Sequence, residues 1–148
     1  MILSSNYQPF ITMNNRGFSL IELLVVLTIL GILATVVAPR VMKHVGTAKS
    51  GTAKLQINEI SAALDLYYLE TSSYPTTKEG LISLVQQPNG INHWNGPYLK
   101  KRSLPLDPWN NAYHYSSPGQ YGPYDLYSFG KDNKAGGVKE DKDIQSWE

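Results

Sequence analysis

The first strong pattern in the chain is an almost unbroken run of apolar residues near its N-terminus. From Phe18 to Ala38 the only charged side chain is Glu22, and leucine, isoleucine and valine make up most of the remainder. As an α-helix, about 21 residues extend roughly 32 Å, which is enough to cross the hydrocarbon core of a bilayer. The pattern therefore predicts a membrane-spanning helix over residues 18–39.

Two other interpretations of this run are weaker. A secretory signal peptide has a shorter apolar core followed by a small-residue cleavage site, and residues 34–38 contain suitable alanines. A buried helix of a soluble protein normally has polar positions, and this run has almost none. Basic residues on the C-terminal side, among them Arg40 and Lys43, outnumber Arg16 on the other. The positive-inside rule alone would therefore place the C-terminal side in the cytoplasm.

Helical periodicity continues beyond Pro39. One apolar stripe repeats at spacings of three and four, namely Ala53, Ile57, Ile60, Leu64 and Tyr68. A second apolar set lies on another side of the helix and comprises Leu55, Ala62, Leu66 and Leu69. The sequence predicts one helix from about Phe18 to Glu70, roughly 80 Å long, that kinks at Pro39 and ends before Pro75.

The C-terminal part of the chain has the two-residue alternation of β-strands. Residues 111–116 place Tyr113 and Tyr115 on one face, and residues 124–129 place Tyr127 and Phe129 on one face. We expect an antiparallel pair whose aromatic residues pack on the long helix. Before it, residues 74–88 predict a turn and a short helix with Thr77 as the N-cap. The predicted class is α+β.

Composition excludes several classes of site. The chain has no cysteine, a formal net charge of +1 and three scattered histidines. Disulfide frameworks and thiolate zinc sites are therefore excluded, and neither a nucleic-acid-binding surface nor a catalytic motif is indicated.

The last stretch, residues 130–148, has few apolar anchors and many charges. Its oxygen-bearing side chains suit Ca²⁺, and they are Asp132, Asn133, Asp141 and Asp143. The spacing is not that of an EF-hand. On composition alone, a solvated turn is favoured over a metal site.

Glu22 raises a separate question, because an acid at the membrane centre costs about 3 kcal/mol and less near an edge. Close to the headgroups, the carboxylate would remain hydrated. The apolar segment itself contains no cation to pair with it. Cleavage between Gly17 and Phe18 would create an α-amino group four residues before Glu22. In staggered copies of the chain, the carboxylate of one copy would then meet the amine of the next.

The stretch RGFSLIELLVVLTILGILATVVAPRV resembles the N-terminal signature of type IV pilin-like proteins. The resemblance implies that a prepilin peptidase cuts after Gly17 on the cytoplasmic face and N-methylates Phe18. It implies that Glu22 is the assembly carboxylate and that residues 1–17 are a cleaved leader, with Met13 an alternative to Met1 as the start. It also places residues 40–148 outside the cytoplasm, against the charge count.

Further motifs, including GPYLKK, LPLDPWNNAYHYSS and DLYSFGKDN, resemble the major pseudopilins of type II secretion systems. The resemblance implies a pilin-like periplasmic domain over residues 40–148 that includes the second half of the helix. It also implies a Ca²⁺ ion held by Asp132, Asp143 and the Phe129 carbonyl. Leu106 and Phe129 depart from the residues common at those positions, and Lys131 and Lys134 add positive charge near the expected ion.

The expected function is that of a structural subunit and not of an enzyme. By resemblance, the protein is anchored in the inner membrane by one span and polymerises through its N-terminal helix into a periplasmic pseudopilus. This filament would drive export of folded proteins across the outer membrane. The implied partners are minor pseudopilins, an assembly platform and its ATPase, the prepilin peptidase and an outer-membrane secretin, with no nucleic acid. The alternatives are a pilus-forming type IV pilin and a membrane-anchored enzyme or lectin.

Overall fold

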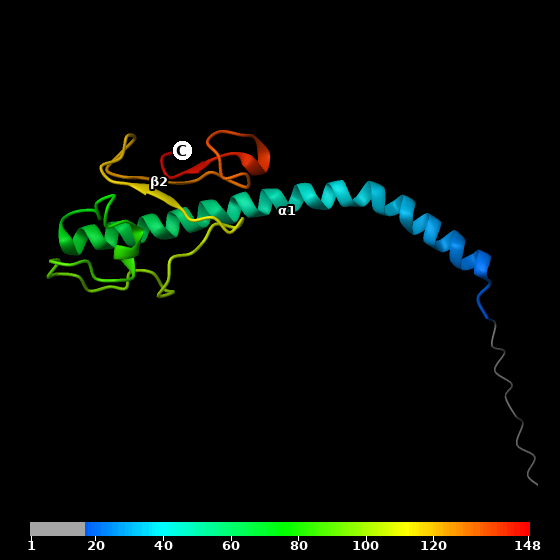
Figure 1. Ribbon diagram of the computed structural model, residues 1–148, viewed down its shortest axis with the longest axis horizontal. Coiled ribbons are helices and arrows are strands. Elements are labelled where there is room, and N and C mark those ends of the chain that lie inside the picture. The colour runs from blue at the N-terminus through cyan, green and yellow to red at the C-terminus, as the bar shows by residue number, and fades with distance from the viewer. Residues whose placement is uncertain (1–16) are drawn as a thin grey trace, which may run out of the picture. The chain divides into compact units, whose positions relative to one another are not determined.

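The structure is a computed structural model that describes residues 17–148, so most of the predicted leader and both possible start residues lie outside the described residues. The chain divides into two units at Pro39. The helical elements are α1 (Leu20–Thr71), η1 (Leu81–Leu84) and η2 (Lys139–Asp141). The strands are β1 (His114–Ser116), β2 (Asp125–Ser128) and β3 (Ile144–Gln145) (Figure 1). The predicted α+β class, a long helix with a small antiparallel sheet, is confirmed.

Helix α1 has 52 residues and contains Pro39, as predicted. At its start the Ser19 hydroxyl accepts a hydrogen bond from the Glu22 backbone N–H at 3.4 Å. At its end Ser72 adopts a left-handed conformation with a φ of 63°, and its N–H donates to the Tyr68 carbonyl at 2.8 Å. A left-handed residue stops helix propagation, so α1 ends there, before Pro75.

The inner face of α1 is largely the predicted apolar stripe. Ala53, Ile57, Ile60 and Leu64 are all buried. The stripe ends at Tyr67, however, and the prediction of Tyr68 was wrong. A helix turns about 100° per residue, so Tyr67 lies close to the centre of the buried face and Tyr68 lies at its flank. Tyr68 is exposed and stacks on Tyr74 with ring centroids 4.8 Å apart.

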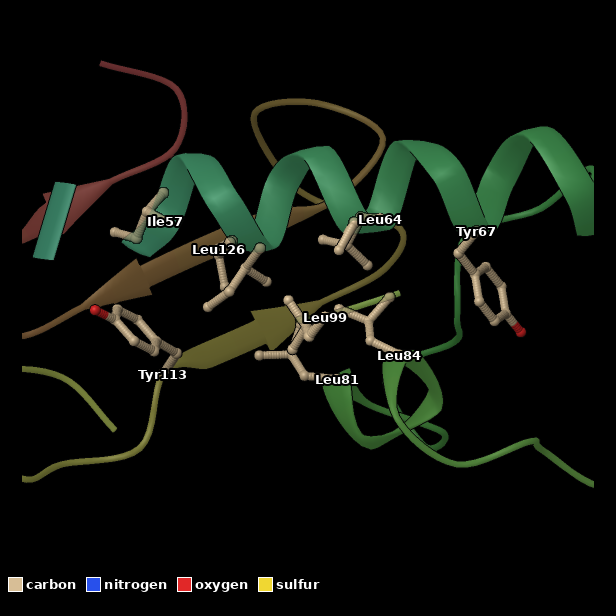
Figure 2. Close-up of a cluster of buried hydrophobic side chains, with 10 residues drawn as sticks. Ile57, Leu64, Tyr67, Leu81, Leu84, Leu99, Tyr113 and Leu126 are labelled. Carbon is tan, nitrogen blue, oxygen red and sulfur yellow. The ribbon is translucent and has the colours of Figure 1, made fainter. Parts of the chain in front are cut away.

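The core lies between this helix face, η1 and the sheet, as Figure 2 shows. Leu81 and Leu84 come from η1, Leu99 from the following loop, and Leu126 from the central strand. Burying one such side chain stabilises the fold by about 1.5–3 kcal/mol. The predicted packing of strand aromatics on the helix is confirmed for Tyr113, which is buried and donates its hydroxyl proton to Gln56 Oε1 at 2.7 Å. It was wrong for Tyr127 and Phe129, which lie outside the core, because Tyr127 alternates with the buried Leu126 and so faces away from the helix.

The sheet has the order β1-β2-β3, and both pairs are antiparallel. Tyr115 is paired with Leu126, which confirms the predicted hairpin. The third strand was not predicted. It comes from the charged tail, where Ile144 is paired with Ser128 and the Ser146 N–H donates to the Leu126 carbonyl. Backbone hydrogen bonds therefore attach the tail to β2. The small number of apolar residues in the tail did not predict this attachment.

The predicted short helix after Pro75 is a 3₁₀ turn of four residues, and Thr77 is not its N-cap. Thr76 forms the reciprocal pair of a capping box instead. Its N–H donates to Glu79 Oε2 at 2.7 Å, and the Glu79 N–H donates to its hydroxyl at 3.3 Å. Gly80 then takes a φ of 65°, which separates this turn from η1. The Thr77 hydroxyl bonds to the Ser117 carbonyl and ties the turn to β1.

Candidate assembly surface and metal-binding loop

The predicted cleavage site lies ahead of α1. Gly17 and Phe18 precede its first residue and are both exposed, Phe18 with 81% of its surface accessible. No atom lies within 4 Å of the position that a Cβ on Gly17 would occupy. In the described part of the chain, therefore, no neighbouring group shields this peptide bond.

Glu22 lies in the first turn of α1, where the partial positive charge of the helix N-terminus favours an acid. Its side chain is exposed, and it forms no ion pair among the described residues. The surrounding helix surface is apolar, and none of the most hydrophobic stretch is buried. By length and composition α1 is long and apolar enough to cross a membrane, and it is the one such helix in the described chain.

The second apolar side of α1 is also exposed. We call Leu55, Ala62, Leu66 and Leu69 the outer stripe. Leu55 is 70% and Leu69 75% exposed, although both lie in the well-packed half of the helix. At 100° per residue the outer stripe lies nearly opposite the buried face. The same helix segment is thus apolar on two opposite sides, and this chain covers only one.

Two of the three predicted metal ligands, Phe129 and Asp143, lie at one end of the sheet. Phe129 directly follows Ser128 in β2, and Asp143 directly precedes Ile144 in β3. Ser128 and Ile144 are paired in an antiparallel ladder, so Phe129 and Asp143 leave the sheet side by side. Asp132 lies in the loop between them, which we call the tail loop (residues 129–143).

Both aspartates retain free acceptor capacity. Asp143 accepts the Gly136 N–H at 3.1 Å to Oδ1 and 3.0 Å to Oδ2, and Asp132 Oδ1 accepts the Lys134 N–H at 3.2 Å. Neither carboxylate belongs to an ion pair within the described residues. An ionised carboxylate offers about four lone-pair positions, so each has room for a cation.

Backbone carbonyls crowd the same loop. Gly130 has a φ of 71°, and a Cβ there would lie 2.7 Å from the Glu140 carbonyl oxygen and 2.9 Å from that of Lys142. A Cβ on Gly137, whose φ is 88°, would overlap the Asp141 carbonyl oxygen. Lys139 is also left-handed, with a φ of 59°, which is unfavourable for a residue with a side chain. The loop is folded tightly, with oxygens pointing inward at its glycines.

The donor set suits calcium. The described residues contain no cluster of three or more His, Cys, Asp or Glu side chains able to hold a metal. A site here would therefore combine two carboxylates with backbone carbonyls, which is a coordination that Ca²⁺ accepts and Zn²⁺ does not favour. The predicted ligands fit the ion in chemistry and in position along the chain.

A buried carboxylate, which was not predicted, fixes the start of the tail loop. Asp107 is only 4% exposed and accepts the Ser128 hydroxyl proton at 2.6 Å. Ser128 Oγ in turn accepts the Gly130 N–H at 3.1 Å. The second oxygen of Asp107 accepts the N–H groups of Trp109 and Asn111. This network surrounds Phe129, and the one available signal was an Asp-Pro turn followed by Asn111.

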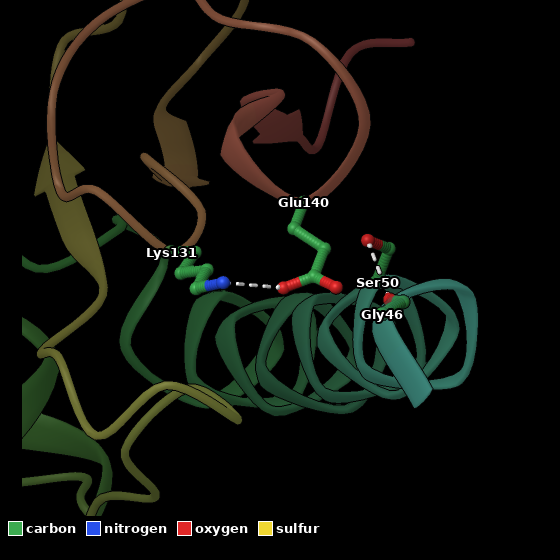
Figure 3. Close-up of polar contacts among 4 residues, drawn as sticks. All are labelled: Gly46, Ser50, Lys131 and Glu140. Carbon is green, nitrogen blue, oxygen red and sulfur yellow. Dashed lines mark hydrogen bonds and ion pairs between the residues drawn. The ribbon is translucent and has the colours of Figure 1, made fainter. Parts of the chain in front are cut away.

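A second anchor joins the tail loop to α1. The Glu140 carboxylate lies against Gly46 and forms an ion pair with Lys131 at 3.1 Å (Figure 3). A Cβ on Gly46 would occupy the space of the Glu140 side chain. In the sequence Gly46 indicates only a weak point of the helix, because its partner lies almost at the other end of the chain.

Comparisons with known proteins show which family the chain resembles. Residues 40–147 match the family described as type II secretion system (T2SS), protein G, and residues 12–38 match the prokaryotic N-terminal methylation motif. The chain is 51% identical over 136 residues to the type II secretion system core protein G of Pseudomonas aeruginosa, covering 89% of this chain and 94% of that protein. It is 40% identical over 140 residues to that of Escherichia coli, covering 92% and 93%.

A solved structure shares the fold. The crystal structure of the major pseudopilin from the type 2 secretion system of enterohaemorrhagic Escherichia coli matches with a TM-score of 0.60 and 30% identity. The match covers 72% of this chain and 92% of that one. The methylation motif and the apolar helix together indicate a membrane-anchored protein. With a family match over most of its length, the chain belongs to the type II secretion system protein G family of major pseudopilins, which are structural subunits and not enzymes.

Proposed function

We propose that this protein is the major subunit of a periplasmic pseudopilus and that it polymerises through α1. The observation that carries the proposal is the long apolar surface of α1, which no other described part of the chain covers. A bilayer covers such a surface before assembly, and neighbouring copies of the helix cover it afterwards. Family membership supports the same role.

Maturation follows from the same region. A prepilin peptidase cuts between Gly17 and Phe18 and N-methylates Phe18, as the match to the methylation motif supports. The new amino group then lies four residues before Glu22. Because Glu22 has no cationic partner in the described chain, it pairs with the amino group of a neighbouring subunit. This pairing sets the stagger between successive subunits.

The outer stripe extends the assembly surface into the second half of α1. Its leucines continue the apolar character of the N-terminal half on the side opposite the chain's own core. Covering three exposed leucines at about 25 cal/mol per Å² adds several kcal/mol to each subunit contact before entropic costs. The polymer is therefore held by the whole helix and not by its membrane half alone.

The filament works between two membranes. One span anchors the subunit in the inner membrane, and residues 40–148 lie in the periplasm. The partners are minor pseudopilins, the assembly platform with its ATPase, and the outer-membrane secretin through which folded proteins leave. The names of the relatives support this setting, since each is a type II secretion system core protein.

Ca²⁺ stabilises the tail loop in this proposal. The ligands are Asp132, Asp143 and the Phe129 carbonyl, with further carbonyls of the loop. The free lone pairs of both carboxylates and the crowding of carbonyls around Gly130 support it. The left-handed residues of the loop cost conformational free energy. Binding of the ion contributes folding free energy that offsets this cost.

The function is tested by deleting the gene in its native host and measuring export of folded proteins into the medium. We expect export to stop and to return when the wild-type chain is supplied. A host that exports normally but loses long surface fibres would instead identify a pilus-forming pilin. Mass spectrometry of the purified protein tests maturation separately, and an N-terminus other than methylated Phe18 would contradict that part.

A further inference from the structure

The sheet face that points away from α1 has a surface hollow walled by aromatic rings. Leu126 points into the core, so its neighbour Tyr127 points to the opposite face. Trp147 stacks on Tyr121 with centroids 4.6 Å apart and meets the edge of Tyr127 at 5.9 Å. Phe129 lies 5.0 Å from Tyr127. The hollow has a volume of about 380 Å³, which is within the range of small-ligand sites.

Uncharged polar side chains surround these rings. Ser116, Gln120 and Gln145 line the hollow, and their side chains form no hydrogen bond with any described residue. Each of the three can both donate and accept a hydrogen bond. The single charged residue in the lining is Asp125, which is 6% exposed. Its carboxylate already accepts the N–H groups of Gln120 at 2.8 Å and Tyr121 at 3.1 Å.

This combination selects a class of ligand. A hexopyranose ring has a face of C–H groups that packs on an aromatic ring, and its rim of hydroxyl groups both donates and accepts hydrogen bonds. We propose that the hollow binds a hexopyranose glycan, whose C–H face packs on the outer face of the stack that Tyr121 and Trp147 form, with the two glutamines at its hydroxyl groups. Anionic and cationic ligands find no free opposite charge there. A proline-rich peptide also packs on aromatic rings, but it offers mainly acceptors.

The site leaves the proposed filament free to assemble. Its residues come from β1, β2 and β3, from the turn before β2 and from the residues just after β2 and β3, and none comes from α1. The subunit contacts proposed above lie on α1 and do not cover the hollow, so a filament carries one glycan site per copy. Weak single-site binding is multiplied by such repetition.

The test uses the full chain in dodecylphosphocholine micelles, which contain no sugar, with ¹⁵N in the tryptophan indoles. The Trp147 signal is assigned with Trp147→Phe. The chain is titrated separately with a tetramer of N-acetylglucosamine, a tetramer of glucose and a proline-rich peptide. We expect millimolar tetramer to shift the Trp147 signal while those of Trp94 and Trp109 stay in place. Tyr121→Ala should weaken binding about fivefold, the equivalent of roughly one aromatic contact.

Tyr68→Ala is the matched control, because Tyr68 is also an exposed tyrosine stacked on another ring but lies on α1. It should leave sugar affinity unchanged. A response to the N-acetylated tetramer alone supports the proposal and identifies a cell-wall type of glycan, and a response to both tetramers supports a general pyranose site. No shift with either sugar, a shift with the peptide alone, or equal affinity in Tyr121→Ala would overturn the proposal.

Discussion

The two halves of α1 carry similar numbers of apolar residues but differ in what covers them. In residues 20–39 apolar side chains surround the helix, and all are exposed in the isolated chain. In the second half, one face from Ala53 to Tyr67 is buried by the chain's own sheet and loops. A helix segment that is apolar on every side therefore needs partners from outside the chain, whereas an amphipathic segment packs its apolar face within the chain. The outer stripe lies in the second half of α1, but like the first half it is apolar and left exposed by the chain.

The largest effect is expected from the one acid in the first half. Glu22→Ala should reduce filament yield at least about tenfold, because it removes the proposed pairing with a neighbouring amino group. Insertion should become easier, by up to about 3 kcal/mol, so loss from the membrane would not explain the defect. Filaments are quantified by shearing and immunoblotting, and membrane fractions report insertion.

Glu59→Ala is the control for that change, because Glu59 is an exposed acid of the same helix in its second half. It should assemble like the wild type. Normal filament yield from Glu22→Ala would contradict the pairing.

The next effect separates the two faces of the second half. Leu64→Ala removes a fully buried side chain and should lower the free energy of unfolding by about 2–5 kcal/mol. Leu66→Ala, two residues along the helix and 51% exposed, should change it by less than about 0.5 kcal/mol. Urea denaturation of the chain in micelles measures both.

Filament assembly should give the complementary result. Leu66→Ala folds normally but removes part of the outer stripe, so its filaments should dissociate at a lower detergent concentration than wild-type filaments. Unchanged filament stability would show that the outer stripe remains uncovered in the polymer.

Calcium removal should lower thermal stability by an intermediate amount, and only in the unit formed by residues 40–148. At calcium one hundred times above its dissociation constant, binding adds about 2.7 kcal/mol, so a chelator should lower the melting temperature by several degrees. Asp143→Ala should melt like the chelated wild type and should not respond to added calcium. Asp65→Ala, which changes an exposed aspartate on α1, keeps the calcium response. Melting that is insensitive to a chelator would exclude the ion.

Two glycines of the second half give a smaller contrast. Gly51→Ala should stabilise the helix by up to about 1 kcal/mol, because nothing lies near the added methyl group. Gly46→Ala meets the Glu140 side chain and should lose that gain. It should also expose the tail loop to protease, since Glu140 must leave its place against α1. Equal stabilisation by both changes would mean that the Glu140 contact carries no energy.

The smallest effect is a loss of stability at alkaline pH in the unit formed by residues 40–148. Burial raises the pKa of Tyr115 to about 12 from its ordinary 10.0, partly offset by a hydrogen bond with Ser117. Above pH 10 the unfolded chain releases this proton before the folded one does, so stability is complete below pH 10 and falls between pH 10 and 12. Tyr115→Phe should flatten this decline in urea denaturation, although it also loses the hydrogen bond to the Pro75 carbonyl. An unchanged decline would assign the alkaline loss to other tyrosines.

Local pattern predicted the long helix and the hairpin because both are encoded over short distances. The stripe from Ala53 to Leu64 and the alternation around Tyr115 each need only neighbouring residues. The missed features all join distant segments. Strand β3 forms by pairing with β2, and Asp107 accepts a hydrogen bond from the distant Ser128 hydroxyl. Gly46 depends on Glu140, and single-sequence periodicity carries no information about such pairs.

The candidate sites also differ in whether neighbouring residues or distant segments form them. Resemblance supplied Gly17, Phe18 and Glu22, and all three are exposed in the structure. Resemblance also supplied Asp132 and Asp143, and the pairing of Ser128 with Ile144 explains how Asp143 comes to lie beside Phe129. The aromatic hollow could not be predicted, because Tyr121 and Trp147 meet only after the tail has folded back along the sheet.

The position of β3 also determines when both edges of β2 are covered. Strand β2 lies in the centre of the sheet, yet its partner on one side comes from residues 144–145, which follow it only after the whole tail loop. Until that segment arrives, β2 is an edge strand with free N–H and C=O groups, and such an edge readily pairs with another chain. A subunit whose C-terminal residues are delayed or trimmed is thus exposed to mispairing with its neighbours. Closure of the sheet by β3 therefore covers an edge that would otherwise be open to pairing with another chain.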